Sequence, residues 1–304
     1  MAWFLLALVG PFMYALTNHI DKILLEKYFK DGGVGTLILF SSLLASIALP
    51  FLFLSDQKVF DLDIVNMIAL AFVGSLNILV LWFYLLALND EEASVAVVFY
   101  QLVPVFGLIL GYFILKEELT QVQIIAMTII ILGTSIISFE IDTENKFKLR
   151  KKTIILMSAA AFFWALESVI FKAVALEENV VRSLFWDHLM QVIVGIIIFI
   201  FIKNYRNNFI SAIKNNSRAI LSLNFTNESL YMFGNIVSSF AYMLAPIALV
   251  LLTESFQPIF VFSIGIFLTI FFPKISAEKI QAKHIWQKII AILITGIGTY
   301  LLFI

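Results

Sequence analysis

Long apolar stretches, separated by short polar connections, follow one another along the whole chain. Each holds about 20 residues, which as a helix would cross roughly 30 Å of hydrocarbon. They fall at 2–20, 34–54, 64–88, 94–115, 121–139, 153–173, 184–202, 219–244, 247–272 and 286–303. Continuous apolar runs exclude a β-barrel, whose strands alternate apolar and polar residues. The pattern predicts an all-α integral membrane protein with ten transmembrane helices.

The order of residues in the first half recurs in the second half. Asn77-Ile78, Tyr84, Leu86 and Ala87 return 158 positions later as Asn235-Ile236, Tyr242, Leu244 and Ala245. Pro104 matches Pro258, and Lys22 matches Lys172. Polar and helix-breaking residues that repeat in register are hard to obtain from an apolar composition alone. We therefore expect two five-helix repeats, at 1–139 and 153–304, joined by a basic linker at 140–152.

The odd number of helices in each repeat has a mechanical consequence. Two five-helix copies enter the membrane from opposite sides, which makes them inverted repeats. Inverted repeats place a substrate site near the bilayer midplane, between the copies, and exchange inward-open and outward-open shapes. The predicted architecture therefore indicates a transporter that works by alternating access.

Composition agrees with a membrane protein and argues against several other classes. Hydrophobic residues make up 62% of the chain and charged residues 13%, more apolar surface than a soluble fold could hide. No cysteine is present, so thiolate metal sites are excluded. Neither a P-loop nor an H-E-x-x-H motif occurs, and Asp187-His188 is explained by a position at the membrane interface. We expect no enzyme activity, cofactor, metal or nucleic-acid partner.

Lysine and arginine gather in alternate connections. Sixteen of the 20 basic residues follow predicted helices 1, 3, 5, 7 and 9, including the cluster from Lys146 to Lys152. Basic loops stay in the cytoplasm. We therefore expect a multi-pass plasma or inner membrane protein with a cytoplasmic linker and both termini outside. Binding of anionic lipid head groups is an alternative interpretation of the cluster.

Three carboxyl side chains fall well inside predicted helices: Glu167, Glu228 and Glu254. A charge near the centre of a membrane helix costs about 3 kcal/mol, so these groups should face a cavity or another helix. A carboxyl that changes protonation between the two access states would couple transport to a proton gradient. His19 is a further candidate for proton relay, because imidazole titrates near neutrality. Structural hydrogen bonding between helices is the competing interpretation.

Polar residues in the eighth predicted helix follow steps of three and four. They are Asn224, Asn227, Glu228, Tyr231, Asn235, Ser238 and Tyr242, and helical spacing puts them on one face. Further cavity residues are expected from other helices: Tyr14, Asn18, Asn77, Tyr84, Tyr100, Gln101, Trp164, Glu167, Glu254 and Gln257. Pro104 and Pro258, at equivalent places in the two halves, are predicted hinges.

The fourth and closing helices of each half carry residues typical of one family. They are Ala93-Ser94-Val95 through Pro104 to Lys116-Glu117-Glu118, Ala248 through Gln257-Pro258, and the pairs Gly133-Thr134 and Gly298-Thr299. In these residues the chain resembles the EamA-like branch of the drug/metabolite transporter superfamily. The resemblance implies ten helices as two repeats over the whole length. It does not imply a cargo, because the superfamily carries amino acids, sugars, nucleotide sugars, polyamines and drugs.

Together these observations predict a secondary-active exporter of a small organic metabolite, such as an amino acid or another cationic or zwitterionic compound. Embedded carboxyls and the lack of lysine or arginine in the predicted core favour such cargo over phosphates, which usually recruit arginine. Proton coupling is expected through the carboxyls named above. A membrane channel and a flippase for lipid-linked substrates stay open as alternatives. Both a monomer and a homodimer are compatible with the sequence.

Overall fold

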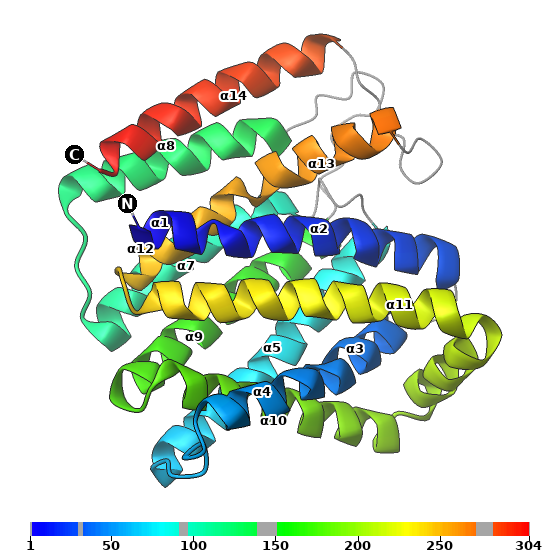
Figure 1. Ribbon diagram of the computed structural model, residues 1–304. Coiled ribbons are helices and arrows are strands. Elements are labelled where there is room, and N and C mark those ends of the chain that lie inside the picture. Colours follow the sequence, from blue (N-terminus) through cyan, green and yellow to red (C-terminus); the bar gives the residue numbers. More distant parts are fainter. Residues whose placement is uncertain (1, 30–32, 91–96, 139–150, 272–281, 304) are drawn as a thin grey trace.

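A computed structural model describes residues 2–29, 33–90, 97–138, 151–271 and 282–303 of the chain (Figure 1). Every secondary-structure element in these ranges is a helix. The basic cluster lies largely outside the described residues, which include only Lys151 and Lys152 of it.

Several of the helical rods change their winding along their length. In the first half, the rods are α1 (Ala2–Ala7) with α2 (Val9–Ile23) and η1 (Leu24–Tyr28), then α3 (Gly33–Leu44) with η2 (Ala45–Ile47) and α4 (Ala48–Ser55), α5 (Ile64–Asp90), η3 (Val97–Gln101) with α7 (Leu102–Leu110) and η4 (Gly111–Leu115), and α8 (Gln121–Ser138). In the second half, they are α9 (Lys151–Glu177), α10 (Val180–Phe201), α11 (Lys203–Tyr242), α12 (Ile247–Leu252) with η5 (Thr253–Phe256) and α13 (Gln257–Phe271), and α14 (Ala282–Leu301).

Six of the described helices are long and apolar enough to cross a membrane. They are Ala2–Tyr28, Gly33–Ser55, Ile64–Asn89, Lys151–Glu177, Val180–Phe201 and Ile247–Phe271, and shorter apolar helices cover Phe99–Leu115, Gln121–Ser135 and Ile292–Leu301. The chain is thus a multi-pass membrane protein, while the count of ten spans stays a prediction. Some predicted boundaries are wrong: residues 203–218, expected as a connection, belong to the 40-residue helix α11.

The outer surface of the bundle is apolar and its interior is partly polar. Phe201 is 79% exposed and Leu54 is 72% exposed, whereas Asn18, Glu228 and Gln257 are buried. Exposed apolar side chains of this size suit contact with lipid, and polar groups in the membrane face the bundle interior. This distribution places the polar chemistry between the helices.

The helix contacts occur in matching sets. The helix α5 packs along α9, and α11 packs along α2, while α8 and α14 lie side by side at one edge of the bundle (Figure 1). Two further pairs of contacts match in the same way. The contact of α10 with α5 matches that of α3 with α11, and the contact of α7 with α9 matches that of α13 with α2. The elements that contribute most to the interior are therefore α2, α5, α9 and α11.

Small residues allow one of these contacts to be close. A Cβ atom at Gly107 of α7 would lie 2.6 Å from Leu251 Cδ1, and one at Gly111 would lie 2.8 Å from Ile247 Cγ2. Glycines spaced four apart let membrane helices approach each other closely. The two glycines thus pack α7 against α12 within one chain.

Both predicted hinge prolines follow a short 3-10 segment. Pro104 lies in the first turn of α7, directly after η3, and Pro258 lies in the first turn of α13, directly after η5. Proline is tolerated in the first helical turn, where its missing N–H has no intrahelical partner. A 3-10 stretch within a longer helical rod often marks a hinge. Movement at these two positions stays a prediction.

Candidate functional site: a polar cavity between the two halves

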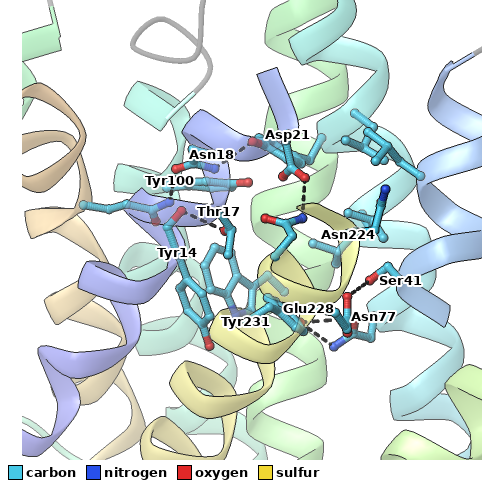
Figure 2. Close-up of a pocket in the computed structure, with 18 of the residues that line it drawn as sticks. Tyr14, Thr17, Asn18, Asp21, Ser41, Asn77, Tyr100, Asn224, Glu228 and Tyr231 are labelled. Atoms are coloured by element: carbon cyan, nitrogen blue, oxygen red, sulfur yellow. Dashed lines mark hydrogen bonds between the residues drawn. The ribbon is translucent and has the colours of Figure 1, made fainter. Parts of the chain in front are cut away.

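A cavity of about 90 Å³ lies among the central helices (Figure 2). The first half lines it with Tyr14, Thr17, Asn18, Asp21, Leu37, Ser41, Asn77, Val80, Leu81, Tyr84, Leu85 and Tyr100. The second half lines it with Trp164, Glu167, Asn224, Asn227, Glu228, Tyr231 and Gln257. Both halves of the chain therefore contribute polar side chains to one cavity.

Most of the predicted cavity residues lie on this lining. They are Tyr14, Asn18, Asn77, Tyr84, Tyr100, Trp164, Glu167, Asn227, Glu228, Tyr231 and Gln257. Helical spacing explains the four residues from α11, because Asn224, Asn227, Glu228 and Tyr231 lie on one face of that helix. Binding of a substrate by any of these side chains stays a prediction.

The remaining predicted residues lie outside the cavity lining. Gln101 is buried, where its Nε2 donates to Ser255 O at 3.2 Å and its Oε1 accepts from Thr134. Tyr242 and Ser168 share a hydroxyl–hydroxyl hydrogen bond of 3.2 Å. Asn235 lies farther along α11, and its Oδ1 atom is buried without a partner. Gln101 and Tyr242 thus connect helices away from the cavity.

Glu254 and His19 also lie outside the lining. The Glu254 side chain is buried, and its Oε1 would be 3.5 Å from a Cβ atom placed on Gly10. Its Oε2 atom is buried without a hydrogen-bond partner. His19 Nε2 pairs with the carbonyl oxygen of Val261 at 2.9 Å, which requires that nitrogen to carry the proton. Thus Glu254 forms no ion pair within the described part of the chain, and His19 links α2 to α13.

Asp21 lines the cavity but is absent from the predicted site. Its Oδ1 accepts a hydrogen bond of 2.7 Å from Asn227 Nδ2, which ties α2 to α11 (Figure 2). The predicted first span ends at residue 20, whereas the helical rod continues to Tyr28, so Asp21 stood at the end of the predicted span and was left out of the predicted site. Its spacing of three from Asn18 was the signal that could have found it.

One hydrogen-bond chain crosses the cavity wall from the second half to the first. Gln257 Nε2 donates to Asn18 Oδ1 at 2.6 Å, and Asn18 Nδ2 donates to Tyr84 OH at 2.7 Å. All three side chains are buried. Buried polar groups of this kind hold their partners in defined orientations, because losing one partner leaves another unsatisfied.

A second network surrounds Glu167. Asn77 Nδ2 lies 2.9 Å from Tyr231 OH and 3.4 Å from Glu167 Oε1. Beside Asn77, Ser41 Oγ donates to Glu228 Oε2 at 2.6 Å (Figure 2). Each embedded carboxyl on the lining therefore accepts a hydrogen bond from the other half of the chain.

The predicted interfacial position of Asp187 and His188 is wrong. Both side chains are buried, Asp187 accepts a 3.2 Å hydrogen bond from Gln191, and its carboxyl interacts electrostatically with Glu167. The tertiary reason is the close approach of α5, because a Cβ atom at Gly74 would lie only 2.5 Å from Asp187 O. The contact with α5 covers the middle of α10 and buries the Asp187 carboxyl, which lies outside the cavity lining.

Aromatic rings form a continuous row along the cavity. Tyr14 contacts Tyr231 with ring centroids 5.4 Å apart and Trp164 at 5.8 Å. Tyr100 contacts Trp164 at 5.0 Å and Tyr84 at 6.1 Å. The row offers several π faces to whatever enters, and such faces attract cations.

One end of the bundle is closed by an ion pair. Lys172 Nζ contacts the Glu117 carboxylate and donates to Ala245 O at 2.7 Å. The other Glu117 oxygen accepts the backbone N–H of Ile247 at 2.6 Å, at the start of α12. The expectation of a core without lysine is therefore wrong, since Lys172 is only 4% exposed. Lys172 can be buried because the Glu117 carboxylate balances its charge and the Ala245 carbonyl accepts one of its hydrogen bonds.

Comparison with known proteins agrees with this architecture. Residues 1–139 match the model of the EamA-like transporter family. These residues, a little under half of the chain, are similar to that family. The resemblance to the drug/metabolite transporter superfamily is thereby confirmed. Members of the EamA-like family are transporters rather than enzymes, which implies a small-molecule substrate and a membrane environment for this chain.

A solved structure shares the fold of this chain. The alignment with a structure titled "Crystal structure of protein" covers 99% of this chain and 94% of that one, with a TM-score of 0.62 and 12% sequence identity. At this identity the likeness concerns the fold alone. No curated protein matches the chain.

Proposed function

We propose that this protein is a secondary-active carrier that moves a small organic metabolite by alternating access. The observation that carries the proposal is a cavity with polar side chains from both halves of a bundle whose outer surface is apolar. A carboxyl-containing space between helices suits a transient binding site better than a permanent pore, because helix-to-helix hydrogen bonds close it from several sides. The EamA-like match of residues 1–139 supports the same class.

The proposed carrier consists of ten transmembrane helices in two inverted repeats, at 1–139 and 153–304. Matching helix contacts support this division: α5 with α9 corresponds to α11 with α2, and α8 pairs with its own counterpart α14. The 3-10 segments η3 and η5, each followed by proline, support it as well. The two repeats would change how they pack against each other by bending at these 3-10 segments.

We propose that both termini face outward and that the linker at 140–152 is cytoplasmic. In that orientation, Asp21 and Tyr84 lie toward the cytoplasmic ends of their helices, and the Lys172–Glu117 pair lies toward the outside. The cavity is then nearer the side from which an exporter takes its cargo. The uneven distribution of basic residues supports this orientation.

The absence of cysteine makes the orientation directly testable. Single variants Lys58→Cys and Lys151→Cys place a thiol on exposed positions at opposite ends of the bundle. In intact cells, a membrane-impermeant maleimide should label the first variant and leave the second unlabelled until the membrane is permeabilised. The reverse pattern would overturn the proposed orientation while leaving the carrier proposal intact.

Proton coupling is proposed through the buried carboxyls Glu254, Glu167 and Glu228. Glu254 supports this most strongly, because it is buried without a cation and one of its oxygens has no partner. An ionised carboxyl in such surroundings is costly, and taking up a proton relieves the cost. A change in access that hydrates the carboxyl would release the proton.

The test uses purified protein in liposomes that contain a pH-sensitive dye. Amino acids, polyamines and quaternary cations are added in turn to wild type, Glu254→Gln, Glu167→Gln and an exposed control, Glu118→Gln. Saturable, substrate-dependent proton flux that is lost in either buried variant and kept in the control would support a proton-coupled carrier. Saturable cargo movement without protons would overturn the coupling, and current without saturation would overturn the carrier.

A further inference from the structure

Hydrogen-bond acceptors are in surplus on the cavity lining. Glu228 is 2% exposed and its Oε1 has no partner, and the same is true of Gln257 Oε1, whose residue is 1% exposed. Asn227 Oδ1 is a third buried oxygen without a partner. All three atoms are acceptors, and a buried acceptor without a donor carries a desolvation cost of about 1–3 kcal/mol.

The amide nitrogens of the same wall are, by contrast, already engaged. Asn227 Nδ2 donates to Asp21, Gln257 Nε2 donates to Asn18, and Asn18 Nδ2 donates to Tyr84. Asn77 Nδ2 donates toward Tyr231 and Glu167. Carboxylates fix these orientations, because they only accept hydrogen bonds and so turn the Asn77 and Asn227 amide nitrogens toward themselves.

Cations are missing from the described lining. None of its residues is lysine, arginine or histidine, whereas Asp21, Glu167 and Glu228 contribute three carboxyls. The nearby Lys172 is held by Glu117 and Ala245 at the closed end, and His19 is held by Val261. A substrate carboxylate would therefore find acceptors and negative groups instead of the donors that it needs.

The aromatic row completes the environment of a cation. Tyr14, Tyr231, Trp164 and Tyr100 are linked by ring contacts of 5.0 to 5.8 Å along the cavity. A cation within about 6 Å of a ring centroid gains roughly 0.5–2 kcal/mol from the π face. Aromatic rings and carboxyl oxygens on one lining suit an ammonium group with an apolar body.

We infer that the cavity binds an organic ammonium ion that carries no carboxylate. The ammonium N–H groups donate to Glu228 Oε1 and to the amide oxygens of Asn227 and Gln257, and the aromatic row covers the apolar part. The inference rests on the proposed carrier function and narrows its cargo from amino acids and cations in general to amines. Zwitterionic amino acids are rejected because their carboxylate would be left unpaired.

A matched pair of probes tests the inference. Cadaverine and lysine share the same five-carbon diamine skeleton and differ only in the carboxylate. Binding to the purified wild-type protein is measured by calorimetry at pH 7.5, and uptake of each radiolabelled probe is measured in liposomes. We expect cadaverine to bind at least tenfold more tightly than lysine and to be transported with saturation.

Two variants locate the site. Glu228→Gln keeps an acceptor for Ser41 but removes the charge, and we expect it to weaken cadaverine binding at least tenfold. The exposed Glu118→Gln removes one carboxyl of the same type and should bind cadaverine as wild type does. If Glu228→Gln does not fold, the comparison of the two probes on the wild-type protein still decides the inference.

Failure of the inference and failure of the proposed function give different results. Equal or tighter binding of lysine, with saturable lysine transport, would overturn the amine inference and leave the carrier in place. No binding of cadaverine would also overturn it. Unsaturable current with either probe would overturn the carrier and the inference together.

Discussion

The two ends of the bundle use lysines that align in the sequence repeat, yet their surroundings differ. Lys172 of α9 donates to Ala245 O, just beyond the end of α11, and Lys22 of α2 donates to Leu88 O at 3.3 Å, in the last turn of α5. Lysine side chains commonly bind the carbonyls left open at a helix end. Both lysines therefore connect one helix to the end of another helix in the same half of the chain.

Only one of the two lysines is enclosed by the opposite half of the chain. The Lys172 side chain is 5% exposed and pairs with Glu117, which also accepts the N–H of Ile247. The Lys22 side chain is 23% exposed, and Glu26, its neighbour one turn away, is largely exposed. The difference indicates that the Lys172 end is closed by contacts between the halves, and those contacts must break if that end opens.

The largest effect is expected from breaking the closed end. Lys172→Met leaves the Glu117 carboxylate without its cation, and breaking a buried pair costs about 3 kcal/mol. The free energy of unfolding in detergent should fall by that amount. The exposed Lys58→Met is the control and should match wild type. Unchanged stability of Lys172→Met would show that the pair does not hold this end together.

The double variant Lys172→Met/Glu117→Leu separates stability from closure. Replacing both partners with apolar residues should restore stability to within about 1 kcal/mol of wild type, because no buried charge is left unpaired. The end should nevertheless open more often, since the bond to Ile247 N is lost as well. A cysteine introduced in place of Ser168, one helical turn before Lys172, should then react with a maleimide at least tenfold faster in the double variant than in the otherwise wild-type protein. Equal labelling rates would contradict the assigned closure.

A smaller effect is expected at the opposite end. Lys22→Met removes a hydrogen bond to one backbone carbonyl and a partly exposed ion pair. Contributions of these kinds are about 1 kcal/mol or less. Thermal unfolding of Lys22→Met and Lys172→Met, measured in parallel, compares the two losses of stability. A loss as large as that of Lys172→Met would remove the asymmetry between the two ends.

The smallest expected effect concerns a loop contact on the same side as the closed end. Asp56 accepts hydrogen bonds from Arg182 and Asn179, and the Arg182 hydrogen bond in particular lowers the Asp56 pKa from 3.8 to about 2. A lowered pKa means that the contact stabilises the fold at neutral pH. This stabilisation is lost as the pH falls from about 4 to about 2.

Comparing Asp56→Asn with wild type across pH tests this contact. The variant should unfold at a slightly lower temperature than wild type at pH 7, and the gap should close as the pH approaches 2. Melting temperatures in an acid-stable detergent give the measurement. A gap that stays constant over this pH range would mean that the Asp56 charge contributes nothing.

How far sequence reasoning reached can be judged from particular residues. The stripe of Asn227, Glu228 and Tyr231 was predictable, because the helical period alone puts these residues on one face and lipid rejects such a face. Asp21 was missed because helix ends are poorly marked in apolar sequence. Gln101 was predicted for the cavity, but it donates to Ser255 O instead, since neighbouring helix breaks leave carbonyls open there.

The sequence by itself determined that the chain is a membrane-embedded, helical transporter, because apolar length, helical period and the family residues are all local properties. Which polar groups face each other was decided only by the tertiary structure. Lys172 and Glu117 are 55 positions apart, and Asn227 and Asp21 are 206 apart, so no local pattern pairs them. Packing of α9 and α11 against the first half brings these groups together, and it thereby forms the Lys172–Glu117 pair at one end of the bundle and places Asn227 against Asp21 on the cavity lining.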